Sequence, residues 1–140
     1  MNWLGWSLLS ALFAGLTAVL AKVGVENVNS HLATAIRTTV ILVFTWAIAM
    51  AFAPAGSMAG LGRRTWIFLV LSGIATGLSW LCYFRALQLG EVAQVAPIDK
   101  LSVVFAIALA ALFLRERMSL QQGIGAGLIV AGALVLAWKR

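Results

Sequence analysis

The sequence is poor in the residues that build most catalytic and metal-binding sites. Its 140 residues include one cysteine, Cys82, and one histidine, His31, which excludes an intrachain disulfide framework and a multi-cysteine or histidine-rich metal centre. With two prolines and no low-complexity run, the chain is neither collagen-like nor disordered. It also lacks a nucleophile elbow, a phosphate-binding loop and a cluster of metal ligands. We therefore predict no enzymatic activity, no catalytic residue, no cofactor and no bound metal.

Charge is scarce as well. Charged residues make up 10% of the chain and apolar residues 63%, whereas a soluble domain has about 25% and about 45–50%. A domain of this size leaves much of its surface exposed and could not hide so much apolar area from water. The net charge is +6, but the basic residues are scattered between apolar runs, as at the flanks of membrane spans. We expect the lipid bilayer, and no nucleic acid, as a partner.

Five stretches are long and apolar enough to cross a membrane as helices, since a helix needs roughly 20 apolar residues for a hydrocarbon core about 30 Å thick. The sequence therefore predicts an all-α, multi-pass protein of the inner (cell) membrane, with a single domain over residues 1–140. Pro97 is expected in the first turn of the fourth helix. Ser119 and Gln122 are expected to form a capping box at the start of the fifth helix. The predicted spans cover residues 3–21, 32–53, 66–87, 96–114 and 120–138.

Basic residues are nearly balanced between the two sides of the predicted bundle. Five spans place the termini on opposite sides, called side A (N-terminal) and side B (C-terminal). The side with more basic residues usually lies in the cytoplasm. Here side A has four basic residues and side B has three, or six if those inside or at the edge of the spans are included. So weak a bias permits both orientations, and hence an antiparallel homodimer, with a single fixed orientation as the alternative. The residues counted are Arg63, Arg64, Arg115 and Arg117 on side A, and Lys22, Lys139 and Arg140, with or without Arg37, Arg85 and Lys100, on side B.

The charges inside the predicted spans lie in their side-B half. Asp99 has a short side chain that cannot reach the interface, so it must meet water, a cation or a donor. Two interpretations stay open: an ion pair with Arg85, Lys100 or Arg37 that ties the third helix to the fourth, or a group that lines a hydrated cavity. The faces of these helices fit two interpretations. A polar end with an aromatic floor on the third helix would suit an amphipathic solute, whereas in the alternative the small and hydroxyl residues only let the helices approach closely. The candidate substrate-pathway residues are Asp99, Lys100, Arg85, Arg37, Lys22, Tyr83, Trp80, Ser102 and Thr38.

Small residues recur every four positions on two of the predicted helices. Gly73 and Gly77 lie in the third span, and Gly123, Gly127 and Ala131 lie in the fifth. Such spacing lets two helix backbones approach closely in a membrane. We interpret these positions as a helix-packing or dimer seam and not as a binding site.

The stretch Trp80-Leu-Cys-Tyr-Phe-Arg-Ala-Leu-Gln-Leu-Gly90 resembles an EamA domain of the drug/metabolite transporter (DMT) superfamily. The similarity continues through residues 95–102 and 113–119, and residues 10–24 and 33–38 fit as well, so it covers essentially the whole chain. Typical members carry two five-helix units as an inverted repeat, whereas this chain holds one. The resemblance therefore implies that two copies pair, antiparallel, and support alternating access. The small multidrug-resistance members place an essential acid in their first helix. Residues 3–21 contain none, so that proton-coupled mechanism is not carried over.

The expected function is secondary transport of a small metabolite, an amphipathic or anionic organic solute, by a homodimer. The resemblance favours export. On side B, four basic residues and three acids leave a net charge of +1, which favours a carboxylate or phosphate held by Arg85 or Arg37, because guanidinium binds such anions bidentately. One alternative is a flippase or carrier for a lipid-linked phosphate substrate. The other is a membrane subunit that does not itself transport.

Overall fold

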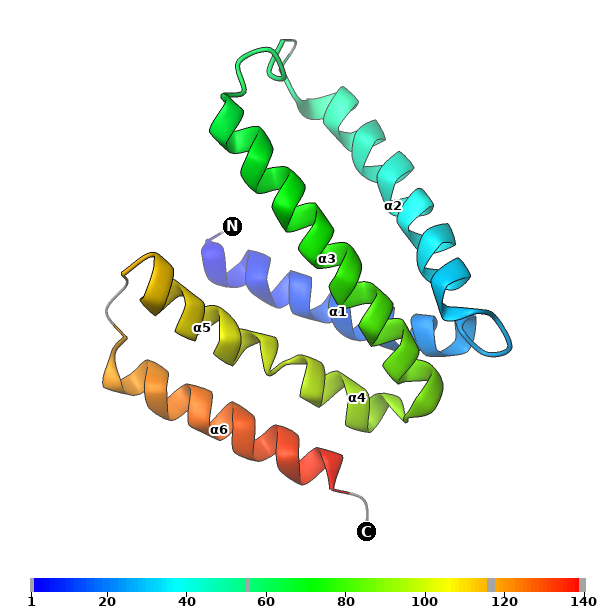
Figure 1. Cartoon of the computed structure of the whole chain (residues 1–140), viewed down its shortest axis with the longest axis vertical. Helices are drawn as coiled ribbons and strands as arrows, with labels where there is room; N and C mark the ends of the chain where they lie inside the picture. Colours follow the sequence, from blue (N-terminus) through cyan, green and yellow to red (C-terminus); the bar gives the residue numbers. More distant parts are fainter. Residues whose placement is uncertain (1, 55, 116–117, 139–140) are drawn as a thin grey trace. The chain divides into compact units, whose positions relative to one another are not determined.

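The computed structural model describes residues 2–54, 56–115 and 118–138. Every regular element in this part of the chain is a helix (Figure 1). Five segments are long and apolar enough to cross a membrane, which confirms the predicted fold class. Arg117, Lys139 and Arg140, which entered the charge count, lie outside the described residues. The helices are α1 (Trp3–Gly24), α2 (Ser30–Phe52), α3 (Arg63–Leu89), α4 (Val92–Asp99), α5 (Ser102–Phe113) and α6 (Leu120–Ala137).

Side-chain caps fix the starts of α2 and α6. Before α2, the side-chain oxygen of Asn29 accepts a 2.9 Å hydrogen bond from the N–H of His31. Before α6, the Ser119 hydroxyl accepts from the N–H of Gln122 at 3.2 Å, and the Gln122 carboxamide oxygen accepts from the N–H of Ser119 at 2.8 Å. This pair of bonds is the predicted capping box, in which two N–H groups without helical partners are satisfied together.

The fourth span consists of two helices, α4 and α5. Because α4 begins at Val92, Pro97 lies inside it, and the prediction that Pro97 opens the helix is wrong. An interior proline removes one N–H and crowds the carbonyl four residues earlier. Just beyond it the ladder tightens: Leu101 N–H donates to the Ile98 carbonyl at 3.0 Å, and Val104 N–H to the Leu101 carbonyl at 2.9 Å. Bonds of this spacing form a 3₁₀ turn, which separates the two helices.

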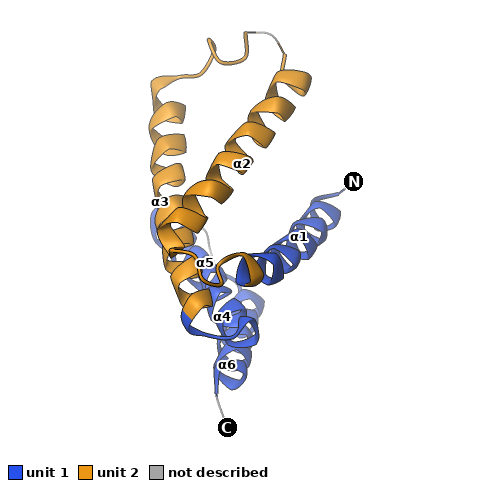
Figure 2. Ribbon diagram, turned by 90° about the vertical axis from the view of Figure 1, so that its right-hand side faces the viewer, with its two compact units in different colours: residues 1–22, 89–140 blue, residues 23–88 orange. Residues whose placement is uncertain are grey.

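The chain divides into two compact units (Figure 2). Unit 1 comprises residues 1–22 and 89–140, and unit 2 comprises residues 23–88. In unit 1, α6 packs along α4 and α5. In unit 2, α2 and α3 run antiparallel, lie close at the end that carries the 25–29 connection and separate towards the 53–62 connection (Figure 2). Val25, Phe84 and Leu87 are buried at that closed end. Most other large apolar side chains are exposed, as suits a protein surrounded by lipid.

Candidate functional site

The predicted pathway residues divide between the two units. Unit 2 holds Arg37 and Thr38 on α2, and Trp80, Tyr83 and Arg85 on α3. Unit 1 holds the remaining ones, which are Lys22, Asp99, Lys100 and Ser102.

In unit 2 the central feature is a stack of Arg37 on two aromatic rings of α3. The guanidinium carbon lies 4.4 Å from the centre of the Trp80 ring and 5.4 Å from that of Phe84. Arg37 follows the start of α2 at Ser30 by seven residues, or about 10 Å along the helix. Trp80 precedes the end of α3 at Leu89 by nine residues, or about 14 Å. The stack therefore lies inside the predicted membrane layer and not at its surface.

The residues around the Arg37 stack differ in burial and in hydrogen bonding. Phe84 is buried, with 3% of its surface exposed, so it forms a fixed wall. Tyr83 lies close enough to Arg37 for an electrostatic interaction. The Thr38 hydroxyl donates a 2.7 Å hydrogen bond to the carbonyl of Thr34 on its own helix. Its proton is thus committed to the backbone, and only its oxygen remains to accept a bond from a ligand.

Arg85 makes a contact within the protein that has a structural role. Its Nη1 donates a 3.1 Å hydrogen bond to the side-chain oxygen of Gln88. The Gln88 Nε2 in turn donates to the carbonyls of Val25 and Val28, which fastens the connection before α2 to the end of α3. We had not predicted a role for Gln88. Its partners are backbone carbonyls about 60 residues away in the sequence, and no local motif indicates such a pairing.

In unit 1 two predicted residues meet at the break in the fourth span. Lys100 Nζ lies 3.4 Å from Asp99 Oδ2, with the side chains 57% and 34% exposed. Among the described residues this is the ion pair that Asp99 makes, and its partner is the next residue in the chain, so it does not tie one helix to another. Exposed pairs of this kind contribute little to stability. Ser102 begins α5 and is exposed.

Lys22 makes a longer-range contact in the same unit. Its Nζ donates a 2.9 Å hydrogen bond to the carbonyl of Gly90, 68 residues further along the chain. The bond fastens the end of α1 to the turn that follows α3. Like Arg85, Lys22 therefore has a structural use that its charge alone did not indicate.

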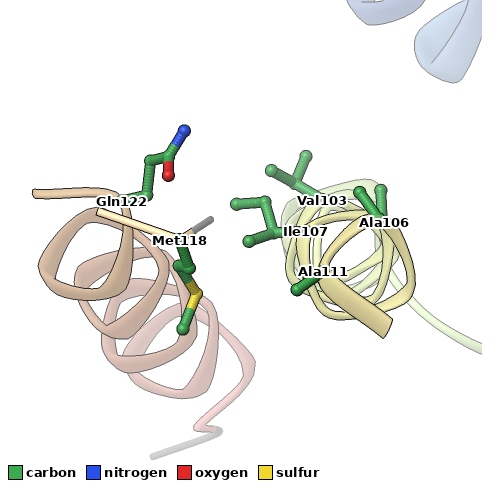
Figure 3. Close-up of a pocket in the computed structure, with 7 residues that line it drawn as sticks. Val103, Ala106, Ile107, Ala111, Met118 and Gln122 are labelled. Atoms are coloured by element: carbon green, nitrogen blue, oxygen red, sulfur yellow. The ribbon is translucent and has the colours of Figure 1, made fainter. Parts of the chain in front are cut away.

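A cavity of about 340 Å³ lies between α5 and the start of α6. Val103 and Ile107 of α5 point towards the α6 side, where Met118 and Gln122 lie (Figure 3). The walls are apolar except for Gln122, whose carboxamide oxygen is held by the capping box. Of the predicted pathway residues in the described part of the chain, none lines this space. Its walls are Val103, Ala106, Ile107, Ala110, Ala111, Met118 and Gln122.

The small-residue positions face open space. A Cβ added at Gly73, Gly77, Gly123 or Gly127 would meet no described atom within 4 Å, and Ala131 is exposed. Within the described part of its own unit, none of these glycines therefore makes a close helix crossing. Their use as a seam between copies stays a prediction.

Comparisons with known proteins assign the chain to a family. The sequence model of the EamA-like transporter family matches residues 1–138. The chain belongs to this family. A protein of Sinorhizobium sp. described as "uncharacterized transporter in cobO 3'region" is 54% identical over 136 residues, which cover 97% of this chain and 96% of the relative. No solved structure matches significantly. This EamA protein is thus a multi-pass membrane protein of a transporter family, and the predicted resemblance is confirmed.

Proposed function

We propose that this EamA protein is a secondary transporter of the inner membrane that exports a small amphipathic metabolite as an antiparallel homodimer. The observation that carries the proposal is the Arg37 stack, a charge held about 10 Å inside a span against two aromatic rings. A charge at a helix centre costs about 2.5–3.5 kcal/mol on insertion scales, and ionisable residues inside spans mark solute and ion pathways.

The family and the Sinorhizobium relative support transport in general. The relative is described as a transporter, and the match covers 96% of its length. An inverted second copy would supply the other half of a pathway, and rocking of the two copies would open it to each side in turn. The near balance of basic residues between the two sides favours insertion in both orientations.

Flux through reconstituted protein tests the proposal. Purified protein is placed in liposomes, and uptake of radiolabelled hippurate, phenylalanine and benzyltrimethylammonium is followed; these share an aromatic body but differ in charge. We expect saturable flux of at least one of them, well above protein-free liposomes. Flux equal to the protein-free level for all three would contradict the proposal. Export is tested in cells, where expression of the protein should lower accumulation of the solute that is transported.

A further inference from the structure

We propose that Arg37 binds the carboxylate of an amphipathic organic anion, and that Trp80 and Phe84 hold the guanidinium in position to do so. This inference rests on the proposed function and deepens it, because it names the chemical class of the substrate and chooses between the two arginines that the sequence left open.

The first support is that Arg37 has no anionic partner within the described part of unit 2. Glu26 is the one acid in the sequence of unit 2, and it makes no ion pair with Arg37. Among the described residues of unit 2, no hydrogen bond uses the N–H groups of Arg37, which contacts the Trp80 and Phe84 rings and interacts electrostatically with Tyr83. A ring attracts the cation through its π face, but stacking leaves the planar edge of the guanidinium unused. That edge carries paired donors that match a carboxylate.

The second support is that two aromatic rings of α3 hold the guanidinium in place. Its carbon lies 4.4 Å from the centre of the Trp80 ring and 5.4 Å from that of Phe84. Because Phe84 is buried, the stack fixes the position of the charge.

The third support is the surface beyond the stack. Counting inward from Trp80 along the same face of α3, the next positions are Gly77 and Gly73. The proposal gives these two glycines a use in binding, in place of the packing seam predicted from the sequence. A Cβ at either one would meet no described atom within 4 Å. On α2, Ile41 follows Arg37 by one turn. A cation at one end of an uncharged surface that small residues leave open fits an acid with an apolar body better than a small polar anion.

Arg85 and Arg64 lack this combination. Arg85 is exposed and donates to Gln88. Arg64 also lies over a ring, 5.8 Å from the centre of Phe68, but it is the second residue of α3 and thus lies at the opposite end of the span. Arg64→Gln is therefore a matched control, since it removes a ring-stacked arginine from the same unit.

Calorimetric titration of the purified full-length protein in detergent tests the assignment. The ligands are hippurate, its neutral amide hippuramide, and phenyl phosphate. We expect hippurate to bind at least about tenfold more tightly than hippuramide, as the loss of charge-assisted hydrogen bonds requires. Failure of hippurate to bind at millimolar concentration, or equal binding of the amide, would overturn the proposal.

Substitutions then locate the anion. Arg37→Gln should weaken hippurate binding about tenfold or more. Arg37→Lys, which keeps the charge but loses the planar fork, should give an intermediate loss, and Trp80→Leu should weaken binding while Trp80→Phe largely retains it. Arg64→Gln should bind as the unchanged protein does. Arg37→Lys and Trp80→Phe keep the test valid if Arg37→Gln misfolds. Unchanged affinity in Arg37→Lys and Trp80→Leu, or an equal loss in Arg64→Gln, would overturn the assignment.

The source of the anion is separated by competition. We expect that phosphatidylglycerol added to the micelles does not displace hippurate. Displacement of hippurate by both the lipid and phenyl phosphate, with hippurate binding more weakly than phenyl phosphate, would contradict the carboxylate assignment. That result would support a lipid-linked phosphate substrate. The proposed function fails separately. Binding of hippurate without flux of any solute would contradict transport alone, and flux of the benzyltrimethylammonium cation that survives Arg37→Gln would contradict the anion site alone.

Discussion

At the scale of single residues, the surroundings of a side chain decide which contacts it makes, as a comparison of Arg37 with Arg85 shows. In the sequence the two arginines are equivalent candidates for an anion site. In the structure Arg85 is bonded to Gln88, whereas Arg37 lies over Trp80 and Phe84. The difference arises from the pairing of α2 with α3, which brings together residues more than 40 positions apart. No periodicity within one helix encodes such a pairing, so the sequence indicated the residue types but not their uses.

The first prediction concerns Gln88. Gln88→Ala leaves the carbonyls of Val25 and Val28 without this donor and should lower the free energy of unfolding by about 1–3 kcal/mol. Unfolding by SDS, followed by circular dichroism, measures the change. Gln121→Ala, at an exposed position of α6, is the matched control and should change the free energy of unfolding by less than about 0.5 kcal/mol. Equal stability of the two variants would show that the Gln88 clamp is not formed.

At the scale of the helices, the sequence predicted a helix end correctly where residues close together in the chain determine it. The Ser119–Gln122 capping box was predicted because both partners lie within four residues. The break of the fourth span was not. Pro97 was visible, but the helix extends back to Val92, because the apolar residues before the proline form a helical turn of their own. A proline in a sequence marks a position without an N–H donor. It does not show whether a helix begins there or is interrupted there, because that depends on how far the helix extends before the proline.

The second prediction concerns the capping box. Ser119→Ala removes the hydroxyl that accepts from Gln122 N–H, and should cost about 1 kcal/mol in the same SDS titration. Ser79→Ala, at an exposed site within α3, should leave stability nearly unchanged. A loss at Ser79 as large as that at Ser119 would argue against a specific capping effect.

The third prediction concerns the break itself. Pro97→Ala restores an N–H inside α4 and removes the steric conflict of the ring, so the helix should become more continuous and more stable. If motion at the break contributes to alternating access, flux into liposomes should fall while the midpoint of thermal unfolding rises. Pro54→Ala, in the connection after α2, should change neither. Unchanged flux in a Pro97→Ala variant that is more stable would contradict a role for the break.

At the scale of the whole molecule, 63% apolar residues were enough to predict lipid as the surrounding medium, and the lengths of the apolar stretches then predicted five membrane helices. The site could be predicted only in part. Arg37 and Trp80 were named, but their stacking depends on a contact between α2 and α3. Many apolar side chains are exposed, and lipid can cover all of them equally well, so the sequence does not encode which face meets a partner.

The fourth prediction concerns the pairing of two copies. Gly127→Leu fills open space in the chain and replaces a poor helix former by a good one, so the helix should fold. If the small-residue face of α6 joins two copies, the variant should run as a monomer in light scattering after size exclusion, whereas the unchanged protein runs as a dimer. Gly125→Leu, about 160° around the same helix, is the matched control and should remain dimeric. Dimers in both variants would remove this face from the interface.

The orientation of the chain in the membrane tests the central claim, a transporter completed by its own inverted copy, most directly. Cys82, the single native cysteine, is replaced by alanine, a cysteine is introduced by Asn2→Cys, and intact cells are treated with a membrane-impermeant maleimide before and after permeabilisation. The account predicts that a substantial fraction of the chains, near half, reacts before permeabilisation and the rest only afterwards. Labelling of all chains in one step would show a single orientation and contradict the antiparallel pair.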